Sequence, residues 1–511
     1  MTLPETLLTW LTDKAGLAPQ ACHHPWPRFE VSEAEWQELI EQMAISPWPL
    51  LGLWAEPARI YLALRDDTAQ DIAVISLPCP GGRFPAVSVM RPAAQRLERA
   101  VHDLFGLKAI GLVDSRPWLD HGVWGISQPL ASSPDTATAS RRPYPFLPVE
   151  GEGVHQIPVG PVHAGIIEPG HFRFHANGEA VVRLEARLGY VHKGIEGLMQ
   201  GRSVAEAALI AARISGDSTV AYSLAFAQAV EAALALQVPL RAVWLRALMA
   251  EMERIANHLG DIGAICNDAA FPLLLTRCHG LREQVARTAA TCFGHRLMMD
   301  RIVPGGVATD LSSASVAAVR RLVAVIEPAF AHLMTIYDDR NSLLDRMVGT
   351  GTIGSHLVHR FGTGGFIGRA AMRDFDARRA PSYPPYDDLD FVVPVLEGGD
   401  VNARVGVRRV EVEESMKLIK IILDRLPDGP IMTTPVSPSP AGEGMALVEG
   451  FRGEILVWVR LTEAGTVARC HARDPSWFQW PLLEAAIEGN IVADFPLCNK
   501  SFNCSYAGHD L

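Results

Sequence analysis

The sequence predicts an α+β protein, in which a small N-terminal α+β domain precedes a larger domain that is mainly a helical bundle. Short β-type runs, broken by proline and glycine, occupy residues 51–89 and are followed by a helical stretch at 92–105. Long helical patterns dominate the second half of the chain, and strand patterns stand before and after them. A length of 511 residues leaves room for about two to four domains of ordinary size.

The boundaries follow from changes in composition along the chain. Residues 1–125 form the N-terminal domain, and residues 153–511 form the larger domain. Between them, residues 126–152 are rich in serine, threonine, proline and alanine, and this composition buries too little apolar surface to order itself. We therefore expect residues 126–152 to be a linker.

The elements of the larger domain are predicted from periodicity. Its first part alternates like a β-hairpin layer, with Asn177-Gly178 as the turn. Apolar residues then recur at helical spacing, and the clearest sets are Met252, Ile255, Leu259 and Ile262, and Val407, Val410, Met416, Ile419 and Leu423. Near the end of the chain, two strands are expected on either side of a turn at 463–465. The run His23-His24 is expected to lie in a loop.

Composition excludes several classes of function. Lys and Arg number 46 against 57 Asp and Glu, a net charge of −11, which argues against nucleic acid or an anionic membrane surface as the main partner. The most apolar long stretch, 221–240, is interrupted by polar residues and proline, so we expect no transmembrane segment. The N-terminus has no secretory signal pattern, and the eight cysteines contain no C-x-x-C pair, which suits a cytoplasmic protein with reduced thiols.

Several segments together resemble one protein family. In chain order they are GPVHAG (160–165), EPGHFRF (168–174), GYVHKGIEGL (189–198), ARIS (212–215), EMERIANHL (251–259), GFIGRAAMRDFDAR (365–378), LDRLPDGP (423–430) and ADFPLCNKSFN (493–503). This order is similar to that of the large subunit of membrane-bound, energy-converting (group 4, formate hydrogenlyase-type) [NiFe] hydrogenases and of its relative, the quinone-site subunit of complex I. The resemblance implies a [NiFe] hydrogenase large-subunit-like fold for residues 153–511.

The N-terminal domain resembles the subunit that neighbours the quinone-site subunit in complex I, chiefly through LERAVHDLFGL (97–107). The segment that follows, VDSRPWLDHG (113–122), matches that family loosely. Fusion of the two units on one chain is similar to the large subunit of formate hydrogenlyase-type hydrogenases.

The positions that hold nickel in this family are changed here. The first pair of family cysteines aligns with Ser215 and Ser218, and the family histidine that follows aligns with Tyr222. The second pair aligns with Ser505 and Gly508. Soft thiolates hold nickel, whereas serine hydroxyls are hard, weak ligands and glycine offers no side-chain ligand. We therefore expect no metal in this chain, and the hydroxyls form either a pocket for ordered water or a vestigial polar pocket.

The positions that contact quinone in complex I relatives are also changed. The family histidine aligns with Ile167 and the family tyrosine aligns with Gly216. The resemblance therefore also puts quinone reduction in the complex I manner in doubt.

Three retained residues are candidates for function. Glu196 matches a glutamate with a proton-transfer role in the hydrogenases, and burial would raise its pKa; the alternative is a helix-start carboxylate or an interdomain salt bridge. Arg213 matches an arginine beside the site and the partner's iron–sulfur cluster; the alternative is a buried structural ion pair. His163 either caps the hairpin by a backbone hydrogen bond or takes part in proton transfer.

Three further candidates match a family segment that closes over the site. They are Arg369, Asp376 and Arg378. Without a metal centre to cover, we expect them to form an ion-pair network in the core.

The leading hypothesis is a peripheral-arm subunit of a membrane-anchored, energy-converting hydrogenase-related complex on the cytoplasmic face of the cell membrane. It would couple electron transfer or conformational change to ion translocation. The resemblance implies as partners an iron–sulfur small subunit that carries the cluster, a ferredoxin-like subunit, a membrane anchor subunit and antiporter-like subunits. Two alternatives stay open: a complex I-type NADH/quinone oxidoreductase subunit, and an active [NiFe] hydrogenase, which would need ligands that the sequence does not show.

Overall fold

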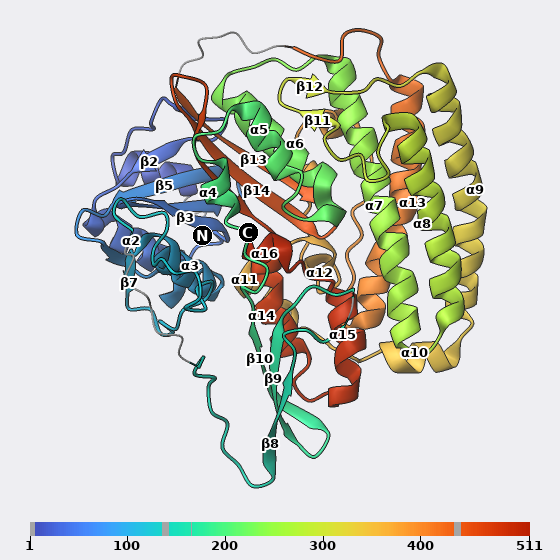
Figure 1. Cartoon of the computed structure of the whole chain (residues 1–511), viewed down its shortest axis with the longest axis horizontal. Coiled ribbons are helices and arrows are strands. Elements are labelled where there is room, and N and C mark those ends of the chain that lie inside the picture. The colour runs from blue at the N-terminus through green and yellow to red at the C-terminus, as the bar shows by residue number, and fades with distance from the viewer. Residues whose placement is uncertain (1–5, 135–142, 165, 434–440) are drawn as a thin grey trace, which may run out of the picture.

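The computed structural model describes residues 6–134, 143–164, 166–433 and 441–511, and it confirms the α+β fold class. Figure 1 shows the N-terminal region (blue) on one side of the central strands β13 (Gly442–Gly450) and β14 (Gly453–Leu461), and a group of long helices on the other. A narrow three-stranded sheet extends away from both. The central strands therefore join the two halves of the molecule.

The N-terminal region is a four-stranded sheet with helices packed on it. The strands run in the order β2-β5-β4-β3, with bounds Arg28–Glu30, Ile72–Pro78, Arg59–Arg65 and Leu50–Glu56. Helix α2 (Glu33–Met43) begins at Ser32, whose side chain accepts a hydrogen bond from the backbone of Glu35 in a capping box. Helix α3 (Gln95–Phe105) ends at Gly106, which adopts a left-handed conformation. The β-runs and the helix predicted at 92–105 are thus present.

This region shares a core with the C-terminal strands. The Trp458 ring of β14 lies 5.7 Å from the Trp54 ring and 5.1 Å from the Tyr61 ring. The Arg28 guanidinium donates to the Glu443 carboxylate at 2.8 Å. The loop expected at His23-His24 is wrong: these residues form β1, which pairs in parallel with β13. A two-residue strand has no periodicity of its own, so only its partner, far along the chain, reveals it.

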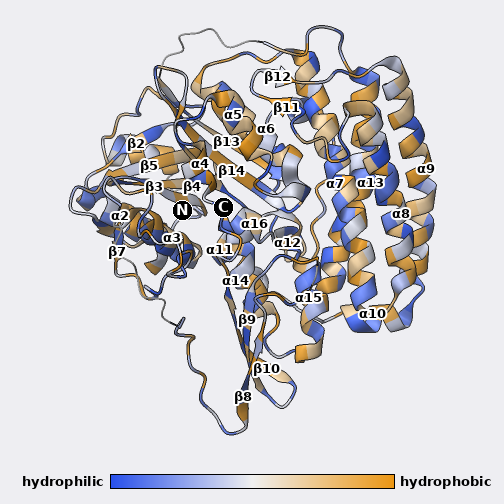
Figure 2. Ribbon diagram, viewed as in Figure 1, coloured by the Kyte–Doolittle hydropathy of each residue, from blue (hydrophilic) through white to orange (hydrophobic). Residues whose placement is uncertain are grey.

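The long helices form the bundle that the periodicity predicts. They are α7 (Leu240–Asp268), α8 (Pro272–Phe293), α9 (Ser313–Asp338) and α13 (Val401–Arg425). Met252, Ile255, Leu259 and Ile262 are all buried, as the spacing requires. Figure 2 shows hydrophilic and hydrophobic segments interleaved along these helices, as expected for elements that bury one face.

Shorter helices connect these parts. They are α4 (Ile195–Met199), α5 (Val204–Ala211), α6 (Thr219–Ala233), α10 (Asn341–Met347), α11 (Ser355–Phe361), α12 (Gly365–Arg369), α14 (Ser476–Ala486), α15 (Phe495–Phe502) and α16 (Ala507–Asp510). None of the helices in the described ranges is both long and apolar enough to span a membrane.

The sheet to which β1 belongs has the order β1-β13-β14-β15, and besides β1 it contains the two predicted strands and one more that the sequence pattern misses. The predicted pair is β14 and β15 (Val467–Arg473), joined by the turn at 463–465. The missed strand, β13, carries glycines at positions 442 and 444, where any Cβ would overlap the backbone of α6 at Ala233 and Ala229. Glycine lowers the strand signal and at the same time lets the helix approach the sheet.

The predicted hairpin layer is the extended sheet of Figure 1, in the order β10-β9-β8. Its strands are β8 (Val154–Val159), β9 (His171–Asn177) and β10 (Ala180–Arg187), and Asn177-Gly178 stands at the tight turn between β9 and β10. Residues 135–142 of the expected linker lie outside the described residues. Tyr144 accepts a hydrogen bond from Arg99 at 2.7 Å, and the Arg187 guanidinium stacks 4.3 Å from its ring.

Candidate functional site

The two segments that align with the family metal ligands meet in the interior. Ser215 precedes a short 3₁₀ turn, Gly216–Ser218, which leads into α6. Ser505 follows α15, which ends at Asn503 in a left-handed conformation. The two hydroxyl oxygens lie 3.1 Å apart, and both residues are buried. The two segments that the alignment singles out therefore lie together in this chain.

A carboxylate and a guanidinium occupy one side of this site. The Ser215 hydroxyl donates to Asp217 at 2.8 Å, and Arg452 donates to Asp217 at 2.5 Å and to the Ser218 hydroxyl at 3.1 Å. Burial alone would raise the pKa of Asp217, but the Arg452 charge and hydrogen bonds outweigh it and lower the pKa to about 2. Asp217 is therefore ionised and paired.

The Asp474 carboxylate fills the space that a side chain would take at Gly508, the position that aligns with the last family cysteine. A Cβ at Gly508 would lie 2.8 Å from Cγ of Asp474 and 2.9 Å from the Ser505 hydroxyl oxygen. Asp474 is held there by the Tyr222 hydroxyl, which donates to it at 2.5 Å, and by the backbone N–H of Ser476 at 2.8 Å. Burial and the Asp474 charge raise the pKa of Tyr222 well above its usual value, so Tyr222 stays protonated as a donor. A side chain at position 508 would overlap Asp474.

These residues do not fit a nickel-iron centre. We call Ser215, Asp217, Ser218, Tyr222, Arg452, Asp474, Ser505 and Gly508 the serine cluster. The atoms that it could offer to a metal are hydroxyl and carboxylate oxygens, which are hard ligands, whereas nickel in a nickel-iron centre needs thiolates.

The two cysteines nearest to Ser505 in the sequence are Cys498 and Cys504. Both are buried, and burial raises the pKa of both thiols, that of Cys498 to about 11. They are therefore protonated thiols at neutral pH.

Glu196 lies in the first turn of α4, buried away from the serine cluster. Its carboxylate accepts hydrogen bonds from Arg469 and, at 2.6 Å, from Nδ1 of His471. Burial would raise its pKa, but Arg469 and His471 together lower the pKa to about 2. The expected raised pKa is therefore wrong, because two donors on β15 compensate the desolvated charge. Of the two structural alternatives for Glu196, the helix-start carboxylate describes its position. Its ion pair lies within the larger domain and does not link two domains.

Arg213 lies at the surface of the chain. Its side chain is 49% exposed and forms a bidentate pair with Asp300, at 2.7 and 2.9 Å. The expected burial is wrong, because the turn before Ser215 directs Arg213 outward while Ile214 and Ser215 enter the core. Arg213 is thus available on the outer side of the segment that carries Ser215.

His163 lies beside aromatic rings. Its ring is 5.5 Å from Phe172 and 6.4 Å from Tyr506, and its Nε2 is buried without a hydrogen-bond partner among the described residues. Ring packing is thus the contact observed for His163, and none of the described residues forms the expected backbone hydrogen bond with it. Ile167 is partly exposed at the same end of the hairpin layer, and Gly216 is exposed at the turn before α6.

Arg369, Asp376 and Arg378 meet in a buried ion-pair network. Arg369 contacts Glu411, Glu449 at 2.9 Å and Asp376 at 3.4 Å, and Arg378 contacts Asp376 at 2.7 Å. We call this set, with its partners, the Arg369 network. Its other members are Glu251, Arg254 and His258 on α7, Glu411 on α13 and Glu449 on β13.

Sequence reasoning missed most partners in both clusters. For α7 a signal existed: Glu251, Arg254 and His258 recur at spacings of 3 and 4, which places polar residues on one face of a helix that is otherwise apolar. No comparable local pattern identifies Asp474 or Arg452, because Tyr222 and Asp217, the side chains that they pair with in the cluster, lie more than 200 residues away.

Two family models match the chain. Residues 270–439 and 434–510 match the family described as respiratory-chain NADH dehydrogenase, 49 Kd subunit. Residues 193–260 match the family described as nickel-dependent hydrogenase. The second match includes Glu196, Ser215 and Ser218, and the first includes Ser505 and Gly508.

Individual proteins are similar over most of the chain. Hydrogenase-4 component G of Escherichia coli (strain K12) is 30% identical over 463 residues, which is 88% of this chain and 80% of the relative. Formate hydrogenlyase subunit 5 of the same strain is 30% identical over 438 residues, 84% of this chain and 77% of the relative. A chain in the structure of the membrane-bound sulfane sulfur reductase, an archaeal respiratory membrane complex, aligns with a TM-score of 0.67 and 26% identity, covering 71% of this chain and 100% of that one.

Proposed function

Because this chain belongs to the family of large subunits that includes hydrogenase-4 component G and formate hydrogenlyase subunit 5, we propose that it is the peripheral-arm subunit of a membrane-anchored, hydrogenase-related complex without a nickel-iron site. The relatives are a hydrogenase component and a formate hydrogenlyase subunit, the matching family is a subunit of a respiratory-chain dehydrogenase, and the similar solved chain comes from a respiratory membrane complex, which supports membership of such a complex. The loss of the metal site and the coupling role go further and rest on this chain's own residues.

One observation carries the proposal: the space of a fourth ligand is filled by the Asp474 carboxylate. Asp474 accepts from Tyr222, Asp217 is paired with Arg452, and the hydroxyls of Ser215 and Ser505 contact each other. Each polar group is thus satisfied by a neighbour, as the interior of a protein requires. If four thiolates stood at these positions, the present hydrogen bonds between these neighbours would be lost.

The remaining role is structural coupling between partners. Arg213 is exposed next to the serine cluster, so it is available to an iron–sulfur small subunit, where its charge would stabilise a reduced cluster. A ferredoxin-like subunit would supply electrons, and a membrane anchor with antiporter-like subunits would use the coupling free energy for ion translocation. The chain itself would lie peripherally on the cytoplasmic face of the membrane.

The proposed domain organisation accompanies this role. Residues 1–125 would be the complex I neighbouring-subunit-like unit and residues 153–511 the hydrogenase large-subunit-like unit. The alignment with hydrogenase-4 component G spans 88% of the chain, which is more than residues 153–511 alone can supply. This coverage supports a fusion inherited as one chain.

The subunit list of the native complex tests the proposal. A tag belongs at Met1, because Leu511 is buried and its carbonyl accepts from Lys193 and Gly194. Mass spectrometry of chains that co-purify from gently solubilised membranes is the measurement. We expect an iron–sulfur small subunit and antiporter-like membrane proteins without an NADH-oxidising module. Recovery of the chain alone would contradict the proposal.

A second candidate is a complex I-type NADH/quinone oxidoreductase subunit, which the match to the 49 Kd subunit family favours. An NADH-oxidising module among the co-purifying chains would support it. Quinone-dependent oxidation in membranes should then fall with Arg213→Ala and with Glu196→Gln. Activity unaffected by either change would exclude these residues from such a reaction.

A further inference from the structure

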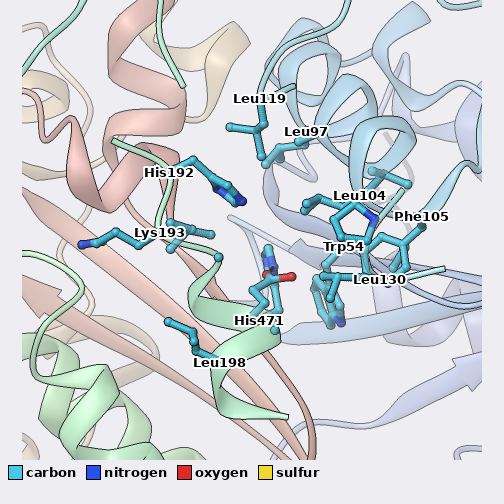
Figure 3. A pocket seen from close by; sticks show the side chains of 18 of the residues that line it. Trp54, Leu97, Leu104, Phe105, Leu119, Leu130, His192, Lys193, Leu198 and His471 are labelled. Carbon is cyan, nitrogen blue, oxygen red and sulfur yellow. Dashed lines mark hydrogen bonds and ion pairs between the residues drawn. The ribbon is translucent and has the colours of Figure 1, made fainter. Parts of the chain in front are cut away.

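Two of the cavities in this chain differ in the polarity of their walls. Figure 3 shows the first, of about 450 Å³, where Leu104 and Phe105 of α3 form part of a mostly apolar wall. Lys193 is directed away from these two residues, and its ammonium donates to the carbonyls of Arg213 and Ile214 at 3.1 and 2.6 Å. The second cavity, of about 300 Å³, is lined instead by several charged side chains.

The second cavity lies between α7, α8 and the 3₁₀ turn before α6. Gly216 and Asp217 of that turn line it, so it borders the serine cluster. Arg282 of α8 and Arg296, in the loop that follows α8, also line it. The cavity therefore opens between two arginines and the turn that carries the first aligned serines.

The loop after α8, residues 294–300, has a fixed shape. Nδ1 of His295 accepts two backbone N–H groups of this loop, each at 3.2 Å. Met298, which lines the cavity, and Asp300 both adopt left-handed conformations, with φ of 57° and 62°. Such conformations cost free energy and are typical of functional segments. Because Asp300 holds Arg213 in an ion pair, this loop also connects the cavity to the exposed Arg213.

The arginines of this cavity are not fully paired. None of the described residues forms a hydrogen bond or an ion pair with the side chain of Arg282, which is half-buried. Arg296 is 67% exposed and approaches only Glu283, at 3.8 Å. Glu283 is also held by Arg287, at 2.9 Å. Positive charge therefore exceeds negative charge on this part of the wall.

The two other carboxyl groups on the wall do not reverse this balance. Asp217 is paired with Arg452 at 2.5 Å. Glu253 accepts the backbone N–H groups of Val220 and Ala221 at 2.7 and 3.1 Å, and burial raises its pKa to about 8, so it is mostly protonated at neutral pH. The cavity thus favours an anion, although the whole chain has a net charge of −11.

We propose that this cavity receives the carboxylate of an aspartate or glutamate side chain of the iron–sulfur small subunit. Arg282 and Arg296 donate to the carboxylate, whose shape matches the guanidinium fork. The methylene groups of the acidic side chain pack on apolar residues of α7 and α8, among them Met252 and Ala286. This role rests on the proposed function and requires an acidic partner surface beside Arg213.

The affinity of the Met1-tagged chain for the small subunit, measured at low and at high salt, tests the proposal. Arg282→Gln together with Arg296→Gln removes both charges. We expect about tenfold weaker binding at low salt, and a smaller difference at high salt, because salt screens the remaining attraction. Arg320→Gln together with Arg346→Gln, at two half-exposed arginines elsewhere on the surface, is the matched control and should leave binding unchanged.

Carbodiimide coupling in the native complex locates the contact. This reagent joins a lysine amine to a carboxylate that touches it and leaves arginine unmodified. Arg282→Lys and Arg296→Lys keep the positive charge, and each should give a crosslink to an acidic residue of the small subunit, identified by mass spectrometry. Arg320→Lys should give none.

The outcomes separate this cavity from the proposed function. A small subunit that binds the unaltered chain, but is indifferent to the changes at 282 and 296 and gives no crosslink there, would overturn the role of the cavity alone. An unaltered chain that recovers no small subunit would overturn the proposed function and this role together.

Discussion

The Arg369 network and the serine cluster are both buried polar regions of one domain, yet they are built in opposite ways. In the Arg369 network, three guanidiniums (Arg254, Arg369 and Arg378) meet four carboxylates (Glu251, Asp376, Glu411 and Glu449). Burial and the nearby Asp376 charge raise the pKa of Glu449. The serine cluster instead relies on hydroxyls, with one carboxylate paired to Arg452 and one bonded to Tyr222.

The difference shows which polar residues the fold itself needs. Removing a charge from the Arg369 network leaves opposite charges desolvated and unpaired, which is expensive. Removing the Ser215 hydroxyl takes away one hydrogen bond to Asp217 but leaves the Arg452–Asp217 pair in place, which costs less. The network is therefore expected to hold the helices against the sheet, while the loss of a hydroxyl from the serine cluster is expected to be tolerated.

The largest effect is expected from Arg369→Met. This change leaves Glu411, Glu449 and Asp376 facing one another without their shared cation, and should lower the free energy of unfolding by about 3–5 kcal/mol. Urea denaturation of the purified chain measures it. Arg320→Met, which removes a half-exposed pair with Asp424, is the matched control and should cost less than about 1 kcal/mol. Equal losses in the free energy of unfolding would contradict the expectation that removing a buried charge costs more than removing an exposed one.

The buried carboxylate of Glu196 gives a second test of buried charge, because its contribution to stability depends on pH. The pKa of Glu196 is about 2 in the folded chain because Arg469 and His471 outweigh burial, below the usual glutamate value of about 4.3. The stability from the carboxylate is therefore present above pH 4.3 and is lost as the pH falls toward 2.

Glu196→Gln lacks this contribution. The stability difference between the unaltered chain and Glu196→Gln should thus shrink by about 2 kcal/mol between pH 6 and pH 3, as followed by urea denaturation at each pH. Glu38→Gln, at an exposed position of α2, serves as the control. A difference that grows as the pH falls would mean that the pKa is raised.

Gly508→Cys tests the packing of the serine cluster. The new Cβ would approach Cγ of Asp474 to 2.8 Å, so the side chains must shift, and overpacking of this kind costs about 1–3 kcal/mol. Thermal unfolding followed by circular dichroism measures the loss. Ser505→Cys, which changes a side chain already present, should cost less. A stable Gly508→Cys protein would show that the space is available to a ligand.

The smallest effect is expected from Ser215→Ala. The change removes hydroxyl contacts with Ser505 and Asp217 and leaves the Arg452–Asp217 pair in place. The expected loss in the free energy of unfolding is about 1 kcal/mol, measured by urea denaturation. A loss as large as that of Arg369→Met would contradict the smaller cost expected for a lost hydroxyl.

The sequence predicted the elements whose signal is local. Helices α7 and α13 follow from apolar spacings of 3 and 4, and the β9–β10 turn follows from Asn177-Gly178. Strand β13 was missed because its glycines serve a contact with α6 that no local pattern encodes. The same limit explains β1, which exists only through pairing with β13.

The candidate site was predictable in position but not in chemistry. The alignment of Ser215 and Ser505 with family cysteines pointed to two segments that lie together, but the roles of Asp474 and Arg452 emerge only when distant segments meet. The expected raised pKa of Glu196 failed for a similar reason, since Arg469 and His471 compensate its burial from another strand. Burial of Arg213 was expected from the family resemblance, yet its side chain is 49% exposed.

The nickel content of the natively purified complex, tagged at Met1, tests the central claim most directly. Hydroxyls, a guanidinium and the Asp474 carboxylate occupy the positions where relatives would need thiolates, so inductively coupled plasma mass spectrometry should find no stoichiometric nickel. One nickel ion for each copy of this chain would contradict the account.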